Sequence, residues 1–126
     1  NSSSSYGNTF TTNDIIGIAV DLDNNKLYFS KNGVFQNSGD PTSGATGTGA
    51  VSILDPDNTT NGSYLFGFGC RNNDGVTWQT NFGNGFFGTT AVASAGTNAG
   101  VGIFEYDVPT GYYALCTKNI NTQEYS

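Results

Sequence analysis

Side chains that could perform acid–base or nucleophilic chemistry are scarce in this sequence. The chain has no histidine, so the usual general base and the commonest zinc ligand are both absent. Its only glutamates are Glu105 and Glu124, and Glu105 has an acidic neighbour two residues away, Asp107. No Ser-His-Asp or Cys-His set can be assembled, and the acidic residues do not fit the paired carboxylates of a glycosidase. We therefore predict that the protein is not an enzyme.

Oxygen ligands suited to calcium gather at one predicted turn. Asp55, Asp57 and Asn58 lie in the connector DPDNTTNG, residues 55–62. Hard oxygen atoms on such a turn are what calcium prefers, but an Asx-Pro turn explains the same residues without an ion. We predict no cofactor, with a calcium ion at these three residues as the alternative.

The two cysteines, Cys70 and Cys116, leave two interpretations open. They either form one disulfide or remain as two buried thiols, and buried thiols are the interpretation that we favour. Two cysteines are too few to identify a redox compartment.

Candidate ligand-binding residues lie at a loop tip and on aromatic side chains beside the loops. Sugars are bound by amides, carboxylates and aromatic rings that act together. The alternative is that these residues form ordinary turns and core aromatics. The candidates are Asn72, Asn73 and Asp74 at the polar tip, with the rings of Tyr64, Phe87 and Tyr113.

The charge distribution excludes several partners. The formal net charge is −6, and the four basic residues are too scattered to form the positive strip that phosphate backbones or anionic membranes require. No apolar stretch approaches the roughly 18 residues of a membrane-spanning helix. We therefore expect neither nucleic-acid binding nor membrane insertion.

The composition indicates an all-β domain. Its 126 residues fit a single domain. Only 11% of them are charged and 13% are aromatic, while 18 Gly, 16 Asn, 16 Thr and 11 Ser supply the polarity. A disordered acidic chain would have few aromatics, and a helical bundle would be rich in Ala, Glu, Lys and Leu.

A β-hairpin is predicted over residues 15–32. Apolar residues alternate along both segments, and Asn24-Asn25 suits a two-residue turn that would place Leu22 opposite Leu27. In that register the apolar side chains of both strands share one buried face: Ile16, Ile18, Val20, Leu22, Leu27 and Phe29.

Several further short strands are predicted, with a long small-residue loop at 37–49. Trp78 shares a predicted strand face with Val76 and Phe82, which indicates a core position rather than a sugar-stacking one. The predicted ranges are 34–36, 50–54, 63–70, 76–82, 101–107 and 112–116.

Three segments carry a family resemblance. FTTNDIIGIAVDLDNNKLYFSKNG, residues 10–33, resembles the central signature of SPRY domains. VTWQTNFG, residues 76–83, is similar to the family's late strand, and VPTGY, residues 108–112, to its closing Pro-x-Gly-Tyr stretch. The segments occur in the family's order, and the resemblance implies an antiparallel β-sandwich related to a jelly roll that binds partners without catalysis.

The early strands of ordinary SPRY domains have no counterpart here. We therefore expect residues 1–126 to be the C-terminal two-thirds of one domain in a longer chain, with 1–9 as a linker and 117–126 as an exit linker. The upstream part of the same chain or another chain would complete the sandwich, because unpaired edges and an uncovered apolar face need a partner.

The Ser, Asn, Gly and Thr bias is similar to that of SPRY copies in tailed-phage and marine viral structural proteins. The resemblance implies a non-enzymatic module of a tail fibre or virion surface that contacts host glycan or neighbouring virion chains. A homo-oligomer is compatible with this role, although no residue demands a threefold interface. The alternatives are a cytoplasmic SPRY adaptor that binds a partner peptide, and a secreted lectin or glycan-active protein.

Overall fold

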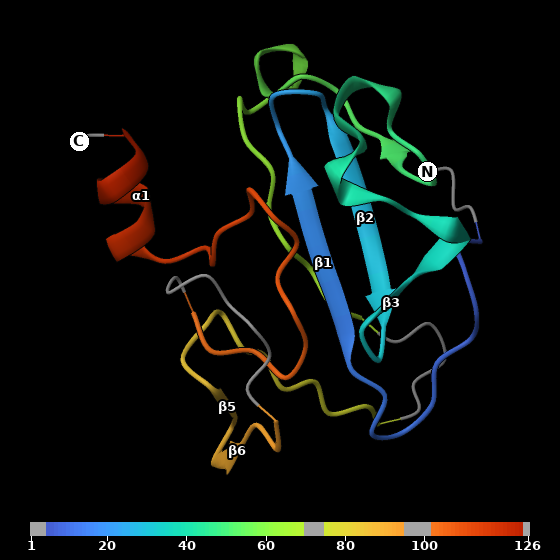
Figure 1. The fold of residues 1–126 in the computed structure, drawn as a ribbon, viewed down its shortest axis with the longest axis vertical. Helices are drawn as coiled ribbons and strands as arrows, with labels where there is room; N and C mark the ends of the chain where they lie inside the picture. Colours follow the sequence, from blue (N-terminus) through green and yellow to red (C-terminus); the bar gives the residue numbers. More distant parts are fainter. Residues whose placement is uncertain (1–4, 70–74, 95–101, 125–126) are drawn as a thin grey trace. The chain divides into compact units, whose positions relative to one another are not determined.

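The computed structural model describes residues 5–69, 75–94 and 102–124, the last three by their backbone alone. The chain divides into two compact units, Asn1–Gly62 and Ser63–Ser126. Most of the elements in the described part are strands in antiparallel sheets, accompanied by short 3₁₀ turns and one α-helix (Figure 1). The protein is therefore all-β, as its composition predicts.

The N-terminal unit is built around a long antiparallel hairpin. β1 (Ile16–Asp21) pairs with β2 (Lys26–Lys31) along their whole length. Ile18 lies opposite Phe29, and Ala19 lies opposite Tyr28. The predicted hairpin is thus present, because alternating apolar residues favour paired extended segments.

The turn of this hairpin has four residues rather than the predicted two, since Asp21 pairs with Lys26. The Asp21 carboxylate accepts hydrogen bonds from the backbone N–H of Asn24 at 2.9 Å and from its side-chain amide at 2.8 Å, which stabilises the longer turn. Asn25 completes the turn at a φ of 56°. The predicted register is therefore shifted by two residues, and Leu22 lies in the turn, 51% exposed.

Two short strands pair with the other edge of β2. β3 (Val34–Phe35) pairs with the end of β2, and β4 (Val51–Ser52) pairs with its beginning. The chain between them forms two 3₁₀ elements, η1 (Gln36–Ser38) and η2 (Pro41–Thr46). β2 is therefore central, and β1 forms an outer edge of this sheet.

The best-buried face of the sheet is not the one that the sequence predicts. Tyr28 is fully buried, with its ring edge-on to Phe35 at 6.5 Å and its hydroxyl 3.3 Å from Ser43 Oγ in η2. Ala19 is also buried, whereas Ile18 on the predicted core face is 37% exposed. The predicted burial is wrong because the small-residue loop after β3 can both cover a tyrosine ring and hydrogen-bond its hydroxyl.

The N-terminal segment crosses the opposite face. The Tyr6 ring lies edge-on to Phe29, with ring centroids 5.3 Å apart, and the Tyr6 hydroxyl donates to the Gly49 carbonyl at 2.7 Å. Residues 5–9, expected to be a linker, thus contribute packing to the sheet even though they form no regular element.

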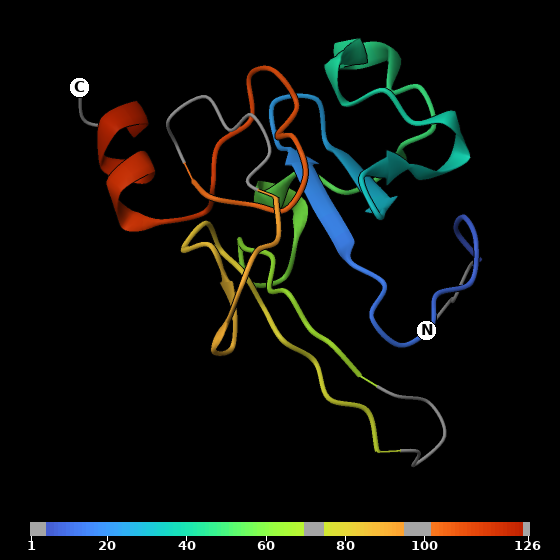
Figure 2. The ribbon, with the colours of Figure 1, turned by 60° about the horizontal axis from the view of Figure 1, so that its bottom comes forward.

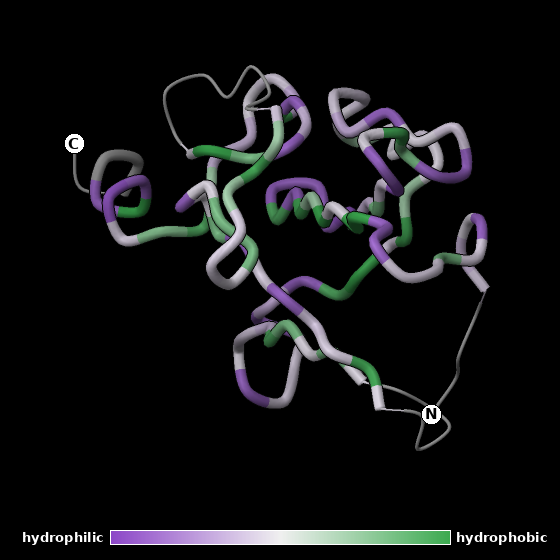
Figure 3. Tube along the Cα trace, turned by 90° about the horizontal axis from the view of Figure 1, so that it is seen from below, coloured by the Kyte–Doolittle hydropathy of each residue, from purple (hydrophilic) through white to green (hydrophobic). Residues whose placement is uncertain are grey.

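The described residues of the C-terminal unit form few regular elements. β5 (Phe86–Phe87) and β6 (Thr90–Ala91) form a short hairpin, Asn84 forms a bridge with Ile103, and α1 (Thr117–Glu124) follows. Its buried positions belong to small or polar residues, among them Gly85, Ala114 and Asn119. Hydrophobic and hydrophilic stretches are interspersed along the described trace (Figure 3).

Several predicted elements differ from the structure in this unit. Within the described residues no strand forms at 63–69, 76–82 or 112–116, and residues 102–107 contribute only the bridge at Ile103. An α-helix occupies 117–124, where an exit linker was expected. Alternating apolar residues predict extended backbone, but a strand also requires a neighbour with a matching ladder.

Candidate functional site

Three of the six predicted ligand-binding residues belong to the described part of the chain. Tyr64 is exposed on an extended segment, Phe87 is half-buried in β5, and Tyr113 is exposed ahead of α1. These rings come from three separate segments of the C-terminal unit. The others lie outside the described residues: Asn72, Asn73 and Asp74.

A different aromatic surface is visible in this unit. Residues 63–69 and 75–82 are two extended segments that run side by side (Figure 2), and we call them the aromatic ribbon. The rings of Phe68 and Trp78 stack between the two segments, with centroids 5.6 Å apart and planes 29° from parallel. Phe68 is 48% exposed and Trp78 is 37% exposed.

The prediction of Trp78 as a core residue is therefore wrong. Among the described residues of the C-terminal unit the buried positions belong to small or polar residues such as Ala114, whereas Phe68 and Trp78 lie at the surface. The sequence signal that could have identified this surface is the regular spacing of Tyr64, Phe66 and Phe68, which places three rings on alternate residues of an uncharged segment.

Asn81 holds the end of the ribbon in place. Its side-chain amide donates to the Ile103 carbonyl at 2.9 Å, and its Oδ1 accepts from the backbone N–H of Gly83 at 2.7 Å and of Gly85 at 3.3 Å. Sequence reasoning included Asn81 in a family-like segment but assigned it no role. Asparagine side chains commonly cap the backbone two residues further on, and the following Gly-x-Gly is the signal for such a turn.

Glu105 also ties backbone segments together. Its carboxylate accepts from the backbone N–H of Ala93 at 2.6 Å and from that of Ser94 at 3.2 Å. Both oxygens are thus occupied by backbone donors, which is a positioning role. The absence of catalysis stays a prediction.

The weak calcium candidate forms a capped turn. Asp55 Oδ1 accepts from the Asp57 backbone N–H at 2.9 Å and begins η3 (Pro56–Asn58), with proline at its first position. This is the Asx-Pro turn that the sequence offers as the alternative to a metal site. Within the described residues no three or more His, Cys, Asp or Glu side chains gather as metal ligands.

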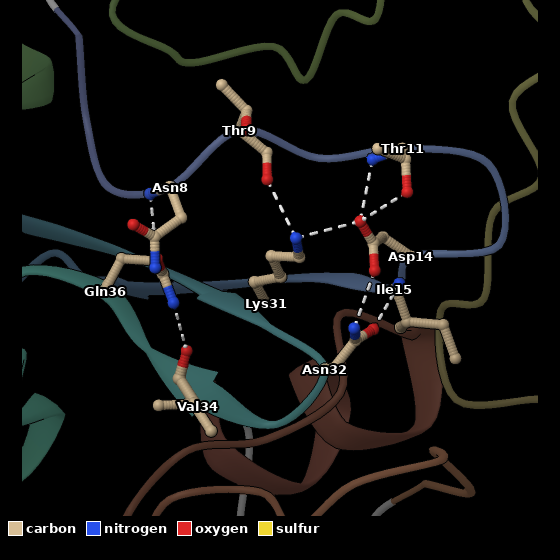
Figure 4. A network of polar contacts seen from close by, with 9 residues as sticks. All are labelled: Asn8, Thr9, Thr11, Asp14, Ile15, Lys31, Asn32, Val34 and Gln36. Atoms are coloured by element: carbon tan, nitrogen blue, oxygen red, sulfur yellow. Dashed lines mark hydrogen bonds and ion pairs between the residues drawn. The ribbon is translucent and has the colours of Figure 1, made fainter.

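A polar network joins the N-terminal segment to the end of β2 (Figure 4). The Asp14 carboxylate accepts from the backbone N–H of Thr11 and the side-chain amide of Asn32, each at 2.7 Å, and lies 3.0 Å from Lys31 Nζ. Asn32 Oδ1 accepts from the Ile15 backbone N–H at 2.8 Å. Hydrogen bonds from Thr11, Asn32 and Lys31 hold the pKa of Asp14 well below its usual range. Because these groups bond one another, the network positions a segment rather than offering a binding site.

Two remaining features, a cysteine thiol and the length of the helix, add no group to the candidate site. Cys116 is a free, half-buried thiol, and Cys70 lies outside the described residues. No helix in the described part of the chain is long and apolar enough to cross a membrane.

Comparisons with known proteins identify no relative. No protein-family model, no curated protein and no solved structure matches the chain.

Proposed function

We propose that this protein is a non-enzymatic recognition module of a virion-surface or tail-fibre protein, and that it binds a cell-surface glycan at the aromatic ribbon. The observation that carries the proposal is the stacked, half-exposed pair of Phe68 and Trp78. Large apolar rings at a surface indicate an interaction site, and sugars present C–H faces that pack on such rings.

The chemistry around the rings fits an uncharged ligand. The described ribbon segments, SYLFGFG and GVTWQTNF, contain no charged residue. Thr80, an exposed residue two positions after Trp78, adds a hydroxyl on the same side of the extended segment. Rings for stacking and neutral groups for hydrogen bonding are the combination that glycan sites use.

The proposed architecture is a SPRY-like β-sandwich in which further strands form a second layer over the N-terminal sheet. The half-exposed face around Ile18 supports this proposal, because an apolar sheet face is stabilised when a second layer covers it. Either the upstream part of the same chain or another virion chain would supply that layer.

Glycan-array binding by the full chain tests the function. We expect binding to a defined set of neutral glycans, and Phe68→Ser or Trp78→Ser should each weaken it about fivefold or more, since one ring contact contributes about 1 kcal/mol. Phe10→Ser is the matched control, because Phe10 is a 54% exposed ring of the N-terminal unit. No binding above that of a glycan-free surface, or equal losses for Phe68→Ser and Phe10→Ser, would contradict the proposal.

A further inference from the structure

The outer edge of β1 is open. β1 pairs with β2 on one side, and no strand of the described residues pairs with its other side. The Asn32 backbone N–H donates to the Ile15 carbonyl at 2.8 Å, which makes this pair a hydrogen-bonded one. Because such pairs alternate along an antiparallel ladder, the backbone groups of Ile16, Ile18 and Val20 point away from β2.

This edge has none of the features that normally prevent strand pairing. The segment IGIAV, residues 16–20, contains no proline and no charged residue, and three of its five residues are β-branched. Natural edge strands are usually protected by lysine, proline, a bulge or short length. The competing edge strands β3 and β4 have only two residues each.

We propose that β1 pairs with β1 of a second copy of this chain, antiparallel across a twofold axis at Ile18. In this register Ile18 faces Ile18 of the second copy, and Ile16 faces Val20. Ile16, Ile18 and Val20 are the residues whose backbone groups point away from β2. This is the one register in which all three of them pair with the same three residues of the other copy. Each of the three pairs exchanges two backbone hydrogen bonds, so about six form.

The side chains support the same register. Ile16, Ile18 and Val20 share one half-exposed face, so pairing extends this face into a continuous β-branched surface across both copies. Asp21 is the only charged residue of β1 and would face Ile15 of the second copy, so no two charged residues face each other directly although each copy carries a net charge of −6.

The symmetric spacing of Ile16 and Val20 about Ile18 favours a second copy of this chain as the partner. Each copy uses the same edge once, so pairing closes as a dimer and leaves no further β1 edge available. A dimer would also present two aromatic ribbons, which raises avidity for a surface that carries many glycans.

Disulfide trapping of the full chain tests the register. In a Cys70→Ser, Cys116→Ser background, Ile18→Cys should cross-link into dimers under mild oxidation, because hydrogen-bonded partners lie about 5.5 Å apart between Cα atoms. Ile16→Cys alone should not cross-link, since the two substituted positions would be about 13 Å apart along the strands. A mixture of the Ile16→Cys and Val20→Cys proteins should give the mixed dimer.

Charge substitution gives an independent readout by analytical ultracentrifugation. Ile18→Lys and Ile18→Glu should each raise the dimer dissociation constant more than about tenfold, because like charges would meet on the axis. Mixing these two proteins should restore a heterodimer, and Val34→Lys, at an exposed position of β3, should leave dimerisation unchanged. A monomer at all concentrations, equal trapping by Ile16→Cys and Ile18→Cys, or pairing with an unrelated strand alone would overturn the proposal.

Discussion

Single polar side chains in this protein connect separate backbone segments by hydrogen bonds. Asn81 connects its own turn to Ile103, Glu105 binds the backbone of residues 93–94, and Asn32 holds the backbone of Ile15. Each such bond contributes only about 1 kcal/mol net. Few large apolar side chains are buried among the described residues, so these hydrogen bonds help to determine where the loops and extended segments lie.

The Asp14 network makes the N-terminal unit sensitive to acid. The folded-state pKa of Asp14 lies below its ordinary value of 3.8, so the ionised carboxylate adds stability above that pH and loses it as the pH falls further. Asp14→Asn should therefore lower the Tm of the unit at pH 7 by a few degrees, and this difference should shrink steadily below about pH 4. Thermal melts of both proteins from pH 2 to pH 7 measure the effect, and a pH-independent difference would argue against it.

At the scale of elements, sequence periodicity predicts the β1–β2 hairpin but not what covers it. The alternation at Ile16, Ile18 and Val20 requires extended backbone, and the asparagines that follow require a turn. The sequence did not predict that the loop at 37–49 covers Tyr28. This loop has almost no apolar residue, and it contacts Tyr28 through its backbone and the Ser43 hydroxyl. Likewise, the strands expected at 63–70 and 76–82 do not form at residues 63–69 or 76–82, because alternation alone carries no information about a partner strand.

Two asparagines in left-handed backbone conformations should respond oppositely to glycine. Asn25 has a φ of 56° and a buried, unpartnered Oδ1, whereas Asn32 has a φ of 49° and a side chain bonded to Ile15 and Asp14. Asn25→Gly relieves the backbone and removes the unpaired oxygen, so the free energy of unfolding should rise by about 0.5–1 kcal/mol. Asn32→Gly gives the same backbone relief but should lower that free energy by about 1–3 kcal/mol.

Urea unfolding followed by amide exchange of β2 measures both glycine substitutions. Because the two positions have similar backbone angles, the difference between them isolates the side-chain hydrogen bonds. Changes of the same sign and size would contradict the role assigned to the Asn32 amide.

At the scale of the whole molecule, the two units differ in the types of residue that they bury. The N-terminal unit encloses Tyr28 between a sheet and a loop, whereas among the described residues of the C-terminal unit the buried ones are glycine, alanine and asparagine, and Phe68 and Trp78 remain half-exposed. Apolar burial is the dominant stabilising contribution in folding. We therefore expect the unit that carries the proposed glycan site to unfold more easily, which is common for binding segments.

Unfolding should then occur in two separable transitions. Trp78 is the only tryptophan, so its fluorescence reports the C-terminal unit alone, while amide protection at Ala19 and Tyr28 reports the hairpin. With increasing urea the fluorescence change should precede the loss of amide protection, because less apolar surface stabilises the ribbon.

A glycan that binds at Phe68 and Trp78 should move only the fluorescence transition to higher urea, since a ligand stabilises the unit that it binds. Coincident transitions, or an equal shift of both by the glycan, would show that the two units unfold as one.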